Sequence, residues 1–342
     1  MNSFELIPTE ENLIHTLDKD LLKRNKDLVR FYDLILVQEG ASSIAIDGRW
    51  GSGKTFFVKQ SMLLINAKNP MSDMDDEKKA SIVYALPFPK KAEDMPENYD
   101  VAVYYDAWEN DNGTDPVLSL VYEIIKQLGI NYAFDDNSNA FKLAGSVLEA
   151  LTGRNINGII ENLKSDNPLT KIKEEKDLHE NIKNFFTELL VERGNRLVVF
   201  IDELDRCKPS YAVQLLERIK HYLYDDRITF VFSVNLGELQ HTIKHYYGNT
   251  FDACRYLDRF FDMRISLPPA DKTAFYREMG LESSYVLEKI CRKVIDTYNM
   301  ELREATRFYR QVKTAAYEPT HESRKFDFSF SDEKIYYFLL SS

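Results

Sequence analysis

The sequence predicts an α/β fold in which a parallel β-sheet carries a phosphate-binding loop. The evidence is the sequence at the ends of three predicted strands. A short β-branched run leads into the pattern G-x-x-x-x-G-K-T at residues 48–55, and a segment with helical spacing follows. A second apolar run ends on Asp202 and Glu203, and a third ends on Asn235. Buried parallel strands are continuous apolar runs, and ligands bind at their carboxyl ends. The three strand ends therefore predict one site.

The loop at residues 48–55 has the composition of a phosphate cradle, the Walker A motif. Its three glycines can take backbone conformations closed to residues with a Cβ, so that successive N–H groups can converge on phosphate oxygens. The helix that opens at Lys54 turns the positive end of its dipole toward the same anion. Lys54 is expected to reach the β- and γ-phosphates, and the Thr55 hydroxyl is expected to ligate Mg²⁺. The predicted nucleotide contacts in the loop are Gly48, Arg49, Trp50, Gly51, Ser52, Gly53, Lys54, Thr55 and Phe56.

The length of 342 residues suits one large α/β domain or two domains, and the composition, with 44% hydrophobic and 29% charged residues, is that of a globular protein. A net charge of −11 repels nucleic acid, and no Lys/Arg block marks a nucleic-acid-binding tail. Cys207, Cys254 and Cys291 are widely spaced and fit reduced thiols in a cytoplasmic protein. No signal peptide is recognisable, and no stretch of about 18 apolar residues predicts a membrane span.

The elements before the strand that ends on Asp202 are predicted from their periodicity and composition. A helix is expected over residues 18–38, where it either flanks the base of the nucleotide or covers one end of the sheet. Residues 69–79 are expected to form a charged loop, and residues 81–88 and 100–105 are β-branched and aromatic runs typical of strands. Pro116 suits the start of a helix that continues to residue 128.

The middle of the chain is the least regular part. Residues 131–173 contain one short amphipathic piece at 141–151 between stretches rich in Asn, Asp and Gly. A clear amphipathic helix is expected over residues 174–193, stopped by a glycine.

The paired acids predict the hydrolytic part of the site. Asp202 fits the Walker B role of holding Mg²⁺ directly or through water, and Glu203 fits the general base that polarises the attacking water. A helix is expected at residues 209–224, and the next strand, at 227–234, ends at Asn235. Asn235 could contact the γ-phosphate and the lytic water, the role called sensor 1; an asparagine in a turn is the alternative.

Two arginines beyond this strand could complete the stabilisation of the transition state. Arg255 and Arg259 are one helical turn apart, just before a strand closed by two prolines. An arginine projected from there could reach the γ-phosphate of a neighbouring subunit. A surface ion pair with Asp258 or Asp262 is the alternative.

The last part of the chain is expected to be a helical lid. Residues 1–270 are assigned to the core and residues 271–342 to the lid, where Arg303 or Arg307 could act as a sensor over the nucleotide or lie on a solvated face. The apolar end at residues 327–340 suggests a chain that is cut short inside a helix or that ends on a partner.

Four motifs together resemble those of the KAP family of P-loop NTPases. They are Gly-x-Trp-Gly-Ser-Gly-Lys-Thr with Trp50, Tyr-Asp-Ala-Trp-Glu-Asn with Trp108, Asp-Glu-Leu-Asp-Arg-Cys at 202–207, and Tyr-Leu-Asp-Arg-Phe at 256–260 before Leu-Pro-Pro. The resemblance begins near residue 20 and runs to the end of the chain. It implies an ASCE-type P-loop NTPase core with a parallel five-stranded sheet ordered 5-1-4-3-2, a C-terminal helical lid, and ATP as the nucleotide.

The same resemblance bears on the tryptophans and on the membrane. It suggests that Trp50 and Trp108 wall the phosphate loop, with a pair of buried core tryptophans as the alternative. Many family members insert transmembrane helices between the two Walker motifs, whereas residues 131–173 of this chain are polar.

These observations favour a cytoplasmic Mg²⁺-dependent ATPase that acts as a nucleotide-driven switch or oligomer in a larger system. The resemblance suggests bacterial antiphage defence as that system. The alternative is a non-hydrolysing module that binds ATP in order to recruit a partner protein. A small-molecule kinase fits less well, because such kinases generally lack the adjacent glutamate and the sensor asparagine. The expected cofactors are ATP and Mg²⁺, and the expected partner is another copy of the chain or a separate effector.

Overall fold

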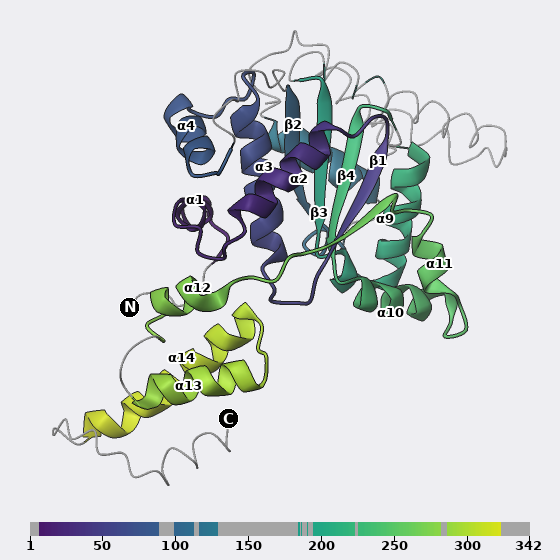
Figure 1. Ribbon diagram of the computed structural model, residues 1–342. Helices are drawn as coiled ribbons and strands as arrows, with labels where there is room; N and C mark the ends of the chain where they lie inside the picture. Colours follow the sequence, from purple (N-terminus) through teal and green to yellow (C-terminus); the bar gives the residue numbers. More distant parts are fainter. Residues whose placement is uncertain are drawn as a thin grey trace, which may run out of the picture. The chain divides into compact units, whose positions relative to one another are not determined.

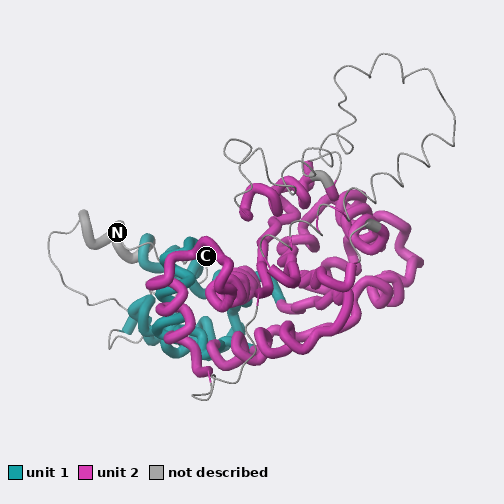
Figure 2. Tube along the Cα trace, turned by 90° about the horizontal axis from the view of Figure 1, so that it is seen from above, with its two compact units in different colours: residues 1–24, 49–53, 269–342 teal, residues 25–48, 54–268 magenta. Residues whose placement is uncertain are grey.

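A computed structural model gives the fold of the protein (Figure 1) and describes residues 7–88, 99–112, 116–128, 184, 186, 190, 194–222, 225–281 and 286–322. The chain forms two compact units, which Figure 2 colours separately. Residues 25–48 and 54–268 make the larger unit, called here the sheet unit. Residues 1–24, 49–53 and 269–342 make the smaller one, the helical unit.

The sheet unit is built on five parallel strands in the order β2-β3-β4-β1-β5. This is the order 5-1-4-3-2 seen from the other side, so the predicted fold class is confirmed. The register pairs Asp106 with Asp202 and Asp47 with Val234, which brings the carboxyl ends of the four longer strands to one edge. The strands are β1 (Ser42–Asp47), β2 (Asp100–Asp106), β3 (Arg196–Asp202), β4 (Ile228–Val234) and β5 (Met263–Ser266).

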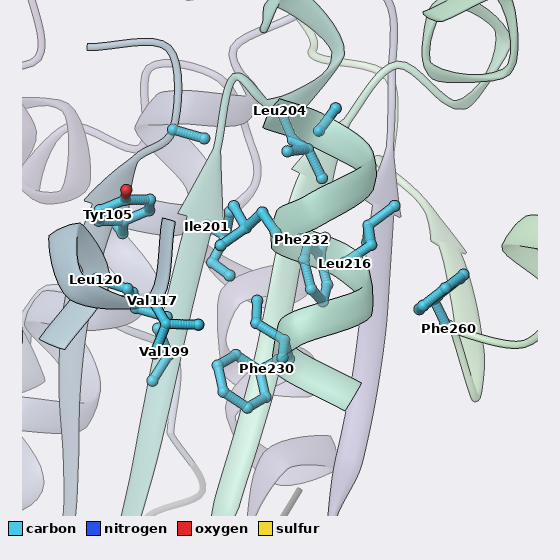
Figure 3. Packing of buried hydrophobic residues seen from close by; sticks show 14 of the residues in the cluster. Tyr105, Val117, Leu120, Val199, Ile201, Leu204, Leu216, Phe230, Phe232 and Phe260 are labelled. Carbon is cyan, nitrogen blue, oxygen red and sulfur yellow. The ribbon is translucent and has the colours of Figure 1, made fainter. Parts of the chain in front are cut away.

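The four longer strands are buried on both faces of the sheet, which explains the continuous apolar runs in the sequence. On one face, Ile201 and Phe232 belong to a cluster that includes residues of α5, α9, α10 and α11, and Figure 3 shows Leu216 of α9 beside Phe232. On the other face, the ring of Phe31 in α2 lies 6.4 Å from that of Phe200 in β3. The helices are α2 (Asn25–Leu36), α3 (Lys54–Lys68), α5 (Pro116–Gln127), α9 (Pro209–Tyr222), α10 (Leu236–Tyr247) and α11 (Ala253–Leu257).

The strand predicted over residues 81–88 is wrong, because helix α4 (Asp76–Tyr84) occupies the first half of this stretch and begins inside the predicted loop. The Asp75 side chain caps the helix by accepting the N–H of Glu77, and acidic residues fill the first turn. Ile82 is its buried residue. A helix that buries one side chain suits the surface, whereas a central strand of this sheet is buried on both faces.

The helix predicted over residues 18–38 begins later than expected, at Asn25 of α2. Asp20 and Lys23 have positive φ angles, which an α-helix does not tolerate in its interior. They follow a separate helix, α1 (Glu10–Asp18).

The described part of the helical unit contains α1, α12 (Lys272–Glu278), α13 (Val286–Thr297) and α14 (Leu302–Glu322). Tyr276, Cys291, Ile295 and Tyr309 belong to its apolar core. The predicted helical character of the region after residue 271 is confirmed up to residue 322. The predictions for 131–173, for most of 174–193 and for the tail at 327–340 lie outside the described residues.

Candidate nucleotide site

The Walker A loop starts at the end of β1 and leads into α3, as its sequence predicted. The Gly48 N–H donates to the carbonyl of Val234 over 3.2 Å, and the Gly48 carbonyl accepts the ammonium of Lys54 over 2.7 Å. Burial lowers the pKa of Lys54, while the nearby carboxylates of Asp205, Asp202 and Glu203 oppose that shift. A buried cation is therefore held between the loop and an acidic strand end.

The turn at residues 49–53 belongs to the helical unit. Gly51 has φ 79° and Gly53 has φ 90°, in the left-handed region that favours glycine. A Cβ at Gly51 would also lie 3.1 Å from the Cβ of Arg303, at the start of α14. The Ser52 hydroxyl is buried and has no hydrogen-bond partner among the described residues. Two glycine positions with little room for a Cβ, together with an unsatisfied hydroxyl, fit an anion such as phosphate.

Arg24 is the residue at this turn that sequence reasoning missed. Its guanidinium is buried, and Nη1 donates to the carbonyl of Ser52 over 2.9 Å. The same nitrogen would lie 3.1 Å from a Cβ placed on Gly53. A lone arginine ahead of α2 carries no sequence pattern, so only the fold reveals this contact.

Asp202 ends β3 with its carboxylate fully engaged and its surface 1% exposed. Oδ2 accepts the Thr55 hydroxyl over 2.7 Å and the Tyr104 hydroxyl over 3.1 Å, and Oδ1 accepts the Glu203 N–H over 3.0 Å. The two predicted metal ligands, Thr55 and Asp202, thus lie in direct contact. Among the described residues no three His, Cys, Asp or Glu side chains form a cage, and Mg²⁺ at a phosphate site does not need one. A hydroxyl and a carboxylate are donors that suit Mg²⁺.

Glu203 follows in a left-handed backbone conformation, with φ 61° and ψ 21°, before the short helix η2 (Leu204–Arg206). Such a conformation costs a non-glycine residue on the order of 1 kcal/mol. Burial, and after it the charge of Asp202, raises the pKa of Glu203 to about 7, against the opposing charge of Arg206. A carboxyl group with a pKa near neutrality suits proton transfer at physiological pH.

Asn235 stands at the end of β4, where it was predicted, and it begins α10 as the N-cap. Its Oδ1 accepts the N–H of Glu238 over 3.4 Å, and Asp47 at the end of β1 accepts the N–H of Leu236 over 2.9 Å. The structure therefore assigns the Asn235 carbonyl oxygen to a helix cap. Its role as sensor 1 stays a prediction.

Known proteins share sequence features with this chain. Residues 25–318 match the KAP family P-loop domain. The chain belongs to this family. Membership implies nucleotide binding, in agreement with the loop and the acidic strand end. A stretch of 95 residues is 33% identical to an uncharacterised protein of Methanocaldococcus jannaschii; the match covers 25% of this chain and 49% of that relative. The chain therefore spans about half the length of the curated relative that it matches.

The two predicted finger arginines of this KAP-family chain precede β5. They are in α11 and just after it, and both side chains are exposed. Their segment leads into the amino end of β5, where the Asp262 side chain accepts the N–H of Ser43 over 2.9 Å. That is the edge of the sheet opposite to Asp202. Asp258, the other acid of the predicted surface pair, contacts Arg264. Asp258 and Asp262 thus have other partners, and the finger role of Arg255 and Arg259 stays a prediction.

The tryptophans are not core residues. Trp50 is 45% exposed in the helical unit and Trp108 is 53% exposed in the sheet unit, so the alternative of a buried pair is wrong. In the helical unit Arg303 lies beside Gly51, and Arg307 lies one turn further along α14; both residues are exposed. No helix in the described part of the chain has the length and hydrophobicity that a membrane crossing requires.

Proposed function

We propose that this KAP-family chain binds ATP together with Mg²⁺ and hydrolyses the γ-phosphate bond. The observation that carries the proposal is the contact between Thr55 and Asp202, with Glu203 directly after it. A Walker A hydroxyl paired with a Walker B carboxylate forms half of a magnesium site, and the adjacent acid supplies a base. Bound Mg²⁺ would neutralise charge on the phosphate oxygens.

In this proposal each residue of the site has a separate role. Lys54 and the N–H groups of the Walker A loop bind the β- and γ-phosphates, and Thr55 and Asp202 hold the metal. Glu203 accepts the proton of the attacking water, and the amide of Asn235 orients that water. Arg303, beside Gly51, supplies positive charge at the loop.

The test is a pair of variants, Lys54→Ala and Glu203→Gln, with Glu77→Gln as a matched control on an exposed part of α4. Lys54→Ala removes the cation of the loop and should abolish binding of fluorescent ATP analogues. Glu203→Gln should keep nucleotide affinity within a few-fold and lower turnover by about 10²–10⁴-fold, the scale of general-base catalysis. Equal turnover by Glu203→Gln and the wild type would exclude Glu203 as the base. Nucleotide binding without turnover in the wild type, at every protein concentration, would favour a non-hydrolysing recruitment module.

We further propose that hydrolysis drives a switch shared with a second copy of the chain or with an effector protein. The exposure of the Arg255 and Arg259 side chains supports an action across subunits. A role in cytoplasmic antiphage defence rests on family resemblance alone. Mass measurement with and without ATP tests the assembly.

A further inference from the structure

Arg206 is a charged residue next to the proposed base that the mechanism above does not use. It forms an ion pair with the carboxylate of Glu203, three residues earlier, across η2. The two side chains are only 23% and 15% exposed, so water screens this pair less than a surface pair. The contact therefore restrains the Glu203 side chain.

The guanidinium of Arg206 is itself braced by an aromatic ring. Its Cζ lies 5.6 Å from the ring centroid of Trp108, within the range of a cation–π interaction. Trp108 lies in the loop after β2. Hydrogen bonds fix this loop before and after Trp108 in the chain. The Ala107 N–H donates to the carbonyl of Asp202 over 3.0 Å, and the carboxylate of Asp111 accepts the N–H of Lys208 over 3.1 Å.

The backbone of Glu203 is fixed by other contacts. Its left-handed conformation and the hydrogen bond from its N–H to Asp202 set where the side chain begins. A glutamate still has three side-chain torsions, which these contacts leave free. A reacting group must be held to within a fraction of an ångström, because a misplacement of about 1 Å can cost a factor of 10² in rate. The ion pair on the braced arginine supplies that restraint.

We propose that Arg206, held by Trp108, is a positioning residue that aims the Glu203 carboxylate for water activation. This inference rests on the proposed hydrolytic function. It assigns a task to the Arg of the Asp-Glu-Leu-Asp-Arg-Cys string and to the exposed Trp108.

The experiment compares Arg206→Gln and Arg206→Lys with Arg292→Gln. Arg292 is a matched control, because it also pairs with a carboxylate, Asp296, and also lies over an aromatic ring, that of Tyr276, but within the helical unit. Arg206→Gln should lower kcat at least about 10-fold with nucleotide affinity within about 2-fold, because positioning acts on the reaction and not on binding. Arg206→Lys should recover part of the loss, because it restores the charge without the planar fork. Arg292→Gln should keep the wild-type kcat.

A double-mutant cycle separates positioning from a structural role. If Arg206 acts through the Glu203 carboxylate, Arg206→Gln causes no further loss of turnover in a Glu203→Gln background. An equal loss in both backgrounds would overturn the proposal, and so would wild-type kcat in Arg206→Gln. Should Arg206→Gln fold poorly in urea titrations, Trp108→Ala at the exposed ring replaces it, with a smaller loss of kcat expected and wild-type kcat contradicting the proposal. A wild-type protein without turnover would instead reject the hydrolytic function itself.

Discussion

The carboxyl edge of β3 and the segment from Arg255 to Arg264 both carry charged residues of the sheet unit, but they hold them differently. At the edge, Asp202 is buried and takes three hydrogen-bond donors, and Glu203 has a fixed backbone and a paired side chain. In the segment, Arg255 and Arg259 are exposed. The proposed metal ligand and base are built into the end of the sheet, whereas the two arginines face solvent.

The difference has an energetic basis. Burying an ionised carboxylate is costly unless charge-assisted hydrogen bonds replace its water, and the donors from Thr55, Tyr104 and Glu203 do so for Asp202. An exposed guanidinium keeps its water and needs no fixed partner. The edge is therefore expected to resist change and the segment to tolerate it.

Thiol chemistry should show the largest contrast, because one cysteine lies at the edge and another directly precedes the segment. Cys254 in α11 is exposed, whereas Cys207 at the acidic edge is buried, and burial raises the pKa of the Cys207 thiol. Since the thiolate reacts, a disulfide reagent at pH 8 should modify Cys254 at least about 10³-fold faster than Cys207, which must wait for the protein to open.

The count of reacting thiols over time measures this, and Cys254→Ser should remove the fast phase. The third thiol, Cys291, is buried in the helical unit, where burial raises its pKa to about 12, and it should react slowly too. Urea should make all three thiols react. A fast phase that survives in Cys254→Ser would show that the acidic edge is open.

Substituting one aspartate in each region tests the same contrast in catalysis. The three contacts to Asp202 all come from donors, so the amide NH₂ of Asp202→Asn must face a donor on one side. With the metal ligand weakened as well, turnover should fall by at least about 100-fold, and the affinity for Mn²⁺ in the presence of nucleotide should fall with it. Asp258→Asn removes an exposed partner of Arg264 and should stay within about 2-fold of the wild type. Similar losses in both variants would contradict the distinction.

The acidic edge also shows which parts of the site can be predicted from the sequence. Asp202, Glu203 and Asn235 could be placed because they follow apolar strands directly, and a parallel sheet brings such ends together. Tyr104 could have been found by alternation, because it lies on β2 two residues before Asp106, the register partner of Asp202. The contact between Trp108 and Arg206 could not, because it joins residues that are far apart in the chain and lie in two loops.

Two failures have a local cause. The run at residues 81–88 has strand-like composition, but a capped first turn and a surface position made its first residues a helix. Arg24 lies inside the range of the longer predicted helix, but two preceding residues have positive φ angles and its side chain contacts Ser52. In both places a short-range backbone feature outweighed the periodicity on which the prediction depended.

Alanine at Arg255 or at Arg259 should have the smallest effects on stability and turnover in dilute protein. Both side chains are exposed, so the free energy of unfolding in urea should change by less than about 0.5 kcal/mol. Turnover of the dilute protein should stay within about 2-fold, because the proposed action of these arginines needs a second subunit. Turnover per molecule, measured against protein concentration, should then rise in the wild type and stay flat in the variant that lacks the acting arginine. A loss of turnover that is already complete in dilute protein would mean that the arginine serves its own subunit, and the division between a prebuilt edge and an outward-facing segment would fail.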